Sequence, residues 1–252
     1  MIERDPVLSA MVLRVVNSAA FGLGRAVTNL SQALVLLGTS HVRSLALAAA
    51  MASTLSNDRT SAGWRNSFAV ACISRTIAHQ IAPNEAATAF ACGLLHDVGD
   101  IVVQSQLSEE AEKIDRFVSE GTPRLAAEVM VLGADHPTIG AALAEHWSLP
   151  GLLADVIEHH HDWAVVPGRS TPSIESLSTE VGRLTAVVGL AEAIWVSLDG
   201  NDYGTEVADI ETLAGVLNIS RIDELVLAAR DDVDRHLGAT GMAPAAASKL
   251  AL

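Results

Sequence analysis

Residues 89–100 read AFACGLLHDVGD and join an apolar helical run to the pair His96 and Asp97. The run is rich in Ala and Leu, which are the strongest apolar helix formers because they lose little side-chain freedom in a helix. The pair then falls where that helix ends, between Gly93 and Gly99, which allow neighbouring helices to approach closely. An imidazole and a carboxylate at such a bend can point into one cavity. The stretch therefore predicts a helical protein with a polar site inside it.

The composition of the whole chain supports an all-α fold. Half of the 252 residues are hydrophobic but only 4% are aromatic, so the core must be built from Ala, Leu, Val and Ile. Strand-rich proteins use alternating runs of β-branched and aromatic residues, and such runs are scarce here. Turn and cap signals divide the second part of the chain into helices expected at 64–81, 85–95, 98–106, 108–120, 122–132, 136–147, 150–161, 177–199, 206–214 and 220–237.

Polar and small residues indicate where the parts of the chain begin and end. The polar run at 57–61 predicts a boundary between an N-terminal helical layer, residues 1–57, and a larger helical bundle, residues 58–237. The Gly, Ala and Pro-rich residues 238–252 predict a flexible tail.

Charge and targeting signals exclude several classes of protein. Lys and Arg total 16 against 30 Asp and Glu, a net charge of −14, which argues against nucleic-acid binding but leaves room for a small basic nucleotide pocket. The N-terminus lacks the apolar core of a signal peptide. The longest uncharged apolar run, residues 44–55, is shorter than the ~20 residues that cross a membrane. Cys72 and Cys92 lie in apolar helical stretches and are expected to be buried thiols. The sequence predicts a cytoplasmic protein.

Residues that bind metals recur at predicted helix ends. Besides His96 and Asp97, His136 opens a helix, and His160 and His161 close another near its negative pole, which favours a cation. Imidazole and carboxylate together suit Zn, Fe, Ni or Mn rather than Ca. A single helical histidine is more often a surface residue or a satisfied core residue. The joint pattern nevertheless predicts one divalent-metal pocket, occupied or vestigial.

The order of these motifs resembles the HDOD proteins, the output-domain relatives of the HD phosphohydrolases found in bacterial signalling. DPVLSAMVLRVVNSAAFGLGRAVTNLSQALVLLGTSHVRSLALA resembles the first HDOD segment. WRNSFAVA, AFACGLLHDVGD, DHPTIGAALAEHWSLP, VIEHHHD and VVGLAEAI match the second segment in order and spacing. The resemblance covers about residues 5 to 200 and implies a multi-helix HD-like bundle with an N-terminal helical layer.

The resemblance also implies a set of metal ligands. It places the HD pair at His96 and Asp97, the helix-opening histidine at His136 and the double histidine at His160 and His161. It places the acidic residue of the last motif at Glu192 and the first histidine position of the superfamily at Asn66.

Three departures from the family pattern bear on catalysis. Asn66 offers a weak amide oxygen in place of an imidazole, and Glu192 moves its carboxylate one methylene farther out. Asp100 stands where catalytic HD enzymes usually carry a lysine that helps to hold phosphate, and a carboxylate would repel that phosphate. The GYP motif of the cyclic di-GMP phosphodiesterase branch is also missing. These departures predict that the metal site is degenerate and that hydrolysis is weak or lost.

We therefore interpret the sequence as a signal-transduction output module, non-catalytic or weakly catalytic, that recognises a protein partner or a small nucleotide-like ligand. The alternatives are an active metal-dependent phosphohydrolase acting on a nucleotide or cyclic dinucleotide, and a scaffold whose pocket is empty. No receiver or DNA-binding motif is recognised, so a signalling partner is expected to act in trans. Asn17, Phe21 and Leu23, at a predicted helix end, are the expected partner-binding residues, although Asn17 also suits a helix cap.

Overall fold

The structure, a computed structural model, describes residues 58–164, 172–199 and 207–240, together with Gln32, Val35 and Gly38. Side chains are described from residue 62 and up to residue 234 within those ranges. The predictions for Asn17, Phe21 and Leu23, and for nearly all of the N-terminal layer, lie outside the described residues.

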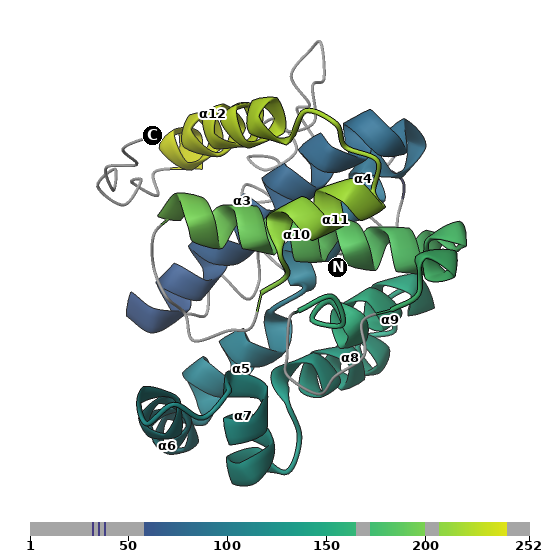
Figure 1. Cartoon of the computed structure of the whole chain (residues 1–252). Coiled ribbons are helices and arrows are strands. Elements are labelled where there is room, and N and C mark those ends of the chain that lie inside the picture. The colour runs from purple at the N-terminus through teal and green to yellow at the C-terminus, as the bar shows by residue number, and fades with distance from the viewer. Residues whose placement is uncertain are drawn as a thin grey trace.

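Helices account for nearly all of the described chain (Figure 1). The α-helices are α3 (Asp58–Ile81), α4 (Ala86–Leu95), α5 (Val98–Gln106), α6 (Ser108–Ser119), α7 (Arg124–Leu132), α8 (His136–His146), α9 (Gly151–His159), α10 (Glu180–Asp199), α11 (Ile210–Val216) and α12 (Ile222–Thr240). Two short 3-10 helices, η3 (Pro83–Glu85) and η4 (Ile174–Ser178), precede α4 and α10. Within the ranges described, the extended structure amounts to an isolated bridge between Ala164 and Ala208, and the all-α prediction is confirmed.

Several helix boundaries differ from those predicted. Helix α3 begins at Asp58, so most of the polar run at 57–61 is the first turn of a helix. Polar and acidic residues suit this position because the first backbone N–H groups have no partner inside the helix. Helix α11 begins four residues later than expected because the side chain of Asp209 caps it, accepting a hydrogen bond from the Thr212 backbone N–H at 2.8 Å. Helix α12 continues to Thr240, into the predicted tail.

The main core forms where α3, α4 and α10 pack together, with α12 covering α3 (Figure 1). Phe68, Phe90 and Leu190 are among its fully buried side chains. Gly93 is essential to the close approach of α3 and α4, because a Cβ atom there would lie 2.8 Å from the Cα atom of Ala71. Small residues at this crossing therefore bring the end of α4, and with it His96, against α3.

A second, smaller core belongs to α5, α6 and α7. It is formed by Val103, Ala111, Ile114 and Ala127, with partly buried Phe117 and other neighbours packed against it. In Figure 1 these helices project from the end of the molecule opposite α12. The α6–α7 hairpin is thus held largely by its own apolar cluster rather than by the main core.

Within the described part of the chain, two apolar stretches are long enough to cross a membrane by length and composition, residues 83–106 and 180–199. In their most apolar windows, 72% and 67% of the residues are buried inside the structure. Both stretches are therefore explained as core helices of the bundle. Cys72 and Cys92 are buried free thiols, as expected, and burial raises the pKa of both.

Candidate metal centre

The predicted ligands lie at three helix ends and within α3 and α10. His96 ends α4 and Asp97 precedes α5, so the chain turns between the two residues. His136 is the first residue of α8, whose N-cap is the Asp135 side chain. His160 ends α9, and His161 follows it. All four histidines are buried, with exposed fractions of 3% or less.

His96 and His160 are oriented by carbonyl groups of their own helices. The Nδ1 atom of His96 lies 2.8 Å from the Gly93 carbonyl oxygen, and that of His160 lies 2.6 Å from the Ile157 carbonyl oxygen. A carbonyl oxygen only accepts, so each Nδ1 carries the proton and donates it. Each Nε2 is then a free lone pair, and both Nε2 atoms are buried without a hydrogen-bond partner. Burial lowers the pKa of both imidazoles, which keeps them neutral.

His136 is oriented by a carboxylate instead. Its Nδ1 atom and its backbone N–H both lie 2.8 Å from Oε2 of Glu128 on α7. Burial opposes protonation of His136, but Glu128, Asp97 and Asp100 outweigh burial and raise its pKa to about 9. A histidine whose second nitrogen donates to a carboxylate is the common arrangement around protein-bound metals, because the carboxylate fixes the ring and raises its basicity.

The potential ligand atoms of these histidines face a common space. The ligand atoms of His136, His160 and His161 lie within 4.8 Å of one another, and so do those of His96, His160 and Glu192. Nε2 of His136 lies 3.1 Å from Nε2 of His161. Two nitrogens bound to one divalent ion at about 2.1 Å would be about 3.0 to 3.4 Å apart. The buried Nε2 atoms of His96 and His160 and this spacing fit a divalent metal.

The two remaining predicted carboxylates lie beside the histidines. Oδ1 of Asp97 is 3.3 Å from Nε2 of His136. Oε2 of Glu192, on the buried face of α10, is 3.6 Å from Nδ1 of His161. The structure therefore places both carboxylates where they can share a cation with the imidazoles.

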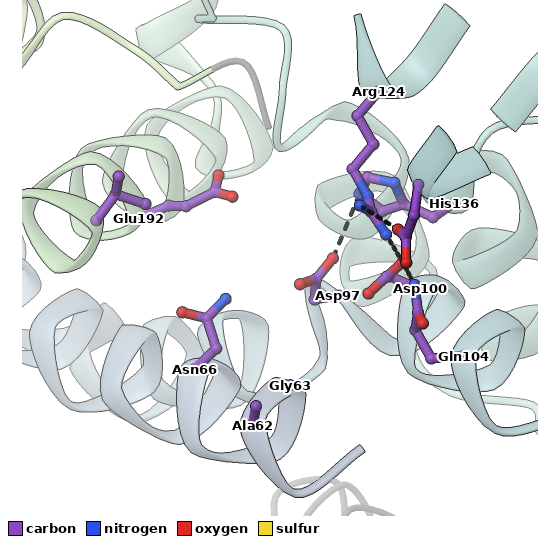
Figure 2. Close-up of a pocket in the computed structure, with 11 residues that line it drawn as sticks. Ala62, Gly63, Asn66, Asp97, Asp100, Gln104, Arg124, His136 and Glu192 are labelled. Carbon is purple, nitrogen blue, oxygen red and sulfur yellow. Dashed lines mark hydrogen bonds and ion pairs between the residues drawn. The ribbon is translucent and has the colours of Figure 1, made fainter. Parts of the chain in front are cut away.

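A cavity of about 300 Å³ opens beside this cluster. Figure 2 shows Asn66 of α3 and Glu192 of α10 on one side of it, facing Asp97, Asp100, Gln104, Arg124 and His136 on the other. Asn66 is 6% exposed, and its Oδ1 atom is buried without a hydrogen-bond partner. The amide thus lies at the cavity wall, with an acceptor available to a ligand or cation.

Asp100 lines the cavity too, but its charge is compensated. Its Oδ1 atom accepts a hydrogen bond from Nη2 of Arg124 at 2.7 Å (Figure 2). Burial raises the pKa of the Asp100 carboxyl, but Arg124, His136 and Gln104 together outweigh burial, so the pKa is lowered. The sequence predicts that the Asp100 carboxylate repels phosphate, and the structure adds that Arg124 pairs with this carboxylate. Arg124 also lies 3.2 Å from Glu128 and 3.6 Å from Asp115, so carboxylates surround the guanidinium.

Two residues of the site escaped the sequence analysis, Arg124 and Glu128. They are the only charged residues in RLAAEVMVL, and their i, i+4 spacing places them on one face of α7. Charges within an apolar helix need partners if buried, and this was the available signal. His159, which precedes His160 in the chain, is not part of the cluster. Its side chain is half exposed, and its Nδ1 atom pairs with Asp162 at 3.0 Å.

The chain is similar in sequence and in fold to several known proteins. The chain is 26% identical over 182 residues to an uncharacterized protein of Treponema pallidum (strain Nichols). The matched region is 71% of this chain but only 36% of the length of that relative. It is 25% identical to a candidate phosphohydrolase from Shewanella amazonensis SB2B, with a TM-score of 0.66 over 95% of this chain and 84% of that one. It is 21% identical to the MmoQ response regulator of Methylococcus capsulatus (Bath), with a TM-score of 0.52 over 89% and 86%.

The family comparison covers the N-terminal layer and most of the site. The model of the HDOD domain matches residues 1–163 of the chain, which include His96, Asp97, His136, His160 and His161. The matched span is well over half of the chain, and this protein belongs to the HDOD domain family.

Proposed function

We propose that this protein is a signal-transduction module that binds a divalent metal in its histidine cluster, hydrolyses phosphodiesters weakly or not at all, and acts by binding a protein partner. One observation supports the proposal above the others. His96, His136 and His160 each have Nδ1 held by an acceptor, and their Nε2 atoms lie in one buried space. Such preorganised imidazoles suit Fe, Mn, Zn or Ni.

The weak-hydrolysis part of the proposal rests on the groups around the cavity. Asn66 supplies an amide where the family's first imidazole is expected. Among the described residues that line the cavity, Arg124 is the cation that could hold a phosphate, but Asp100, Asp115 and Glu128 already compensate its charge. Phosphoryl chemistry needs both a metal-activated water and positive charge on the phosphate. The site favours the first requirement over the second.

Metal binding is tested by titrating the purified chain with Mn²⁺, Fe²⁺, Zn²⁺ and Ni²⁺ in a calorimeter. We expect stoichiometric binding that is lost in His160→Ala, because His160 belongs to both groups of ligands. His159→Ala is the matched control, since it removes an exposed imidazole one residue away. Equal affinities for the two variants would contradict the assignment of the site.

An active phosphohydrolase remains the second candidate, because Arg124 lines the same cavity as the histidines and because one structural relative is a candidate phosphohydrolase. The metal-loaded protein is assayed against cyclic di-GMP, a linear dinucleotide and a generic phosphodiester. We expect at most trace turnover. Robust turnover that disappears in a His96→Ala/Asp97→Ala variant would establish the enzyme instead. The double variant Asn66→His/Asp100→Lys tests whether the two substitutions are what limits hydrolysis.

The proposed partner is a signalling protein on a separate chain. A small nucleotide-like ligand is the alternative binding partner. The N-terminal residues Asn17, Phe21 and Leu23 remain the surface proposed from the sequence. A Phe21→Ala/Leu23→Ala variant, checked for folding by circular dichroism, is compared with wild type in a pull-down from native extract. Retention of every partner by this variant would exclude that surface.

A further inference from the structure

Helix α7 packs Ala127 in the smaller core but otherwise departs from the amphipathic pattern expected of a surface helix. Its only two charged residues, Arg124 and Glu128, are buried, with exposed fractions of 9% and 1%. On the opposite face, Val129 and Met130 are 49% and 64% exposed, and Ala126 is exposed beside them. A surface helix normally turns its charges to water and its apolar residues to the core. Contiguous exposed apolar side chains on such a helix mark an interaction surface.

The inner face of α7 explains why its charges point inward. Glu128 holds His136 through two hydrogen bonds of 2.8 Å, and Arg124 pairs with Asp100 of α5 at 2.7 Å. The inner face is thus fixed by the metal centre. Nothing in that requirement accounts for the apolar outer face, so the outer face needs an explanation of its own.

The charge of the neighbouring helix indicates what kind of partner fits. Helix α6, which packs directly against α7, has the sequence SEEAEKIDRFVS, with four acidic and two basic residues. Glu109, Glu112 and the following Glu120 are exposed, and Glu110 and Asp115 are partly exposed. The whole chain carries a net charge of −14. An apolar stripe beside an acidic helix is complementary to an amphipathic helix with basic flanks.

We propose that the outer face of α7, formed by Ala126, Val129 and Met130, is a docking surface for a basic amphipathic helix of a partner protein. Because the same helix carries Glu128 and Arg124 into the metal centre, docking and metal occupancy are coupled. The coupling rests on the proposed function, whereas the docking does not. Any shift of α7 on docking moves the carboxylate that orients His136, and linkage requires that metal binding in turn changes the affinity for the partner.

Docking is tested on the full chain with a fluorescent 18-residue helical peptide of Leu and Lys, whose Leu residues lie on one face. A second peptide, with Glu in place of Lys, tests whether binding requires a positively charged helix. Measurements in EDTA keep the outcome independent of metal. We expect the Lys peptide to bind and the Glu peptide to fail, and we expect Val129→Ser/Met130→Ser to weaken binding at least tenfold. Hydrogen exchange should show peptide protection within residues 123–133.

The matched control removes two equally exposed apolar side chains elsewhere. Ile174→Ser/Leu227→Ser replaces residues that are 70% and 54% exposed on η4 and α12. This variant should bind the Lys peptide as wild type does. Equal loss in both double variants, or wild-type binding by the α7 variant, would overturn the docking surface and reduce the binding to general charge attraction.

Coupling is then tested by repeating the titration with the protein loaded with Mn²⁺. We expect the dissociation constant of the Lys peptide to change by about fivefold or more, and we expect Glu128→Gln to abolish that change. An unchanged dissociation constant in a protein that demonstrably binds Mn²⁺ would overturn the coupling. Failure of Mn²⁺ to bind at all would instead count against the proposed function, while the result in EDTA would still decide the docking.

Discussion

The histidines of the site differ in what holds them. His96 and His160 are fixed by carbonyls three residues earlier in the chain, whereas His136 depends on Glu128, eight residues away on another helix. A carboxylate behind an imidazole both orients the ring and strengthens it as a ligand. The loss of that carboxylate should therefore be felt at the metal rather than only in stability.

We expect Glu128→Gln to weaken metal binding about 10- to 100-fold, the usual effect of removing such a supporting carboxylate. The amide keeps the shape of the side chain but loses its charge. Glu112→Gln, on the exposed face of α6, is the control and should bind metal like wild type. The measurement is calorimetric titration with Mn²⁺, and identical affinities for both variants would show that Glu128 plays no part in ligation.

Sequence reasoning identified the histidines at this scale but not their supports. His96, His136 and His160 follow recognisable motifs, because ligand residues at helix ends leave a local pattern. Their i, i+4 spacing predicts only the contact of Glu128 and Arg124 with each other. Their contacts with His136 and Asp100 on other helices leave no local pattern. Asp100 shows the same limit, since its carboxylate is read directly from the sequence and its pairing with Arg124 is not.

At the scale of helices, glycine contacts position the site. Gly99 of α5 lies so close to α8 that an added Cβ atom would sit 2.0 Å from the His136 carbonyl oxygen and 2.9 Å from the Gly140 backbone nitrogen. Backbone atoms cannot yield as a flexible side chain can. The first turn of α8, which carries His136, is therefore held in place by the absence of a side chain at residue 99.

We expect Gly99→Ala to lower the free energy of unfolding by at least about 2 kcal/mol, as overpacked contacts do, and to lower metal affinity because His136 is displaced. Gly215→Ala in α11 is the control. Its Cβ atom meets nothing within 4 Å, so the substitution should stabilise the protein by about 0.5 to 1 kcal/mol. Denaturant unfolding measures both, and an unchanged Gly99→Ala protein would contradict the crossing described.

Helix positions were largely predictable, and helix ends less so. The apolar periodicity that defines α4, α5 and α8 is local, and each was expected within one or two residues. The start of α11 depends on the Asp209 cap, and that of α10 follows η4, where Thr179 Oγ1 accepts the Gly182 N–H at 3.0 Å. Several polar residues near each start could have served as caps, and only the folded chain selects one.

For the whole molecule, an ion pair links the beginning of the described chain to its end. Arg75 of α3 donates to Asp232 of α12 at 2.7 Å, and the two side chains are 8% and 14% exposed. Removing one member of such a pair leaves the other charge buried without compensation. We expect Asp232→Ala to lower the free energy of unfolding by about 3 kcal/mol. Asp231→Ala, at an exposed position next to it, should change the free energy by less than about 0.5 kcal/mol.

The two hydrophobic cores should also differ in how easily they open. Cooperative units with few buried apolar side chains open with lower free energies than the global unfolding reaction. We expect the amides of α6 and α7 to exchange hydrogen faster than those of α3, α4 and α10, in metal-free protein at neutral pH. Mn²⁺ should slow exchange in α7 more than in α12. Uniform protection across both cores would mean that they unfold as one unit.

The carbonyl anchors of His96 and His160 also bear on how this site can change during evolution. Every residue type supplies a backbone carbonyl, so the aim of each imidazole does not itself depend on the residue type at 93 or 157. Glycine is required at 93 for a separate reason, the close packing of α4 on α3. A lineage can therefore lose Asn66, Glu192 or the groups near the cavity and still inherit correctly turned histidines. His136 is different, because its orientation depends on the side chain of another residue, Glu128. In diverging descendants these two positions should be kept together or lost together, while His96 and His160 persist on their own.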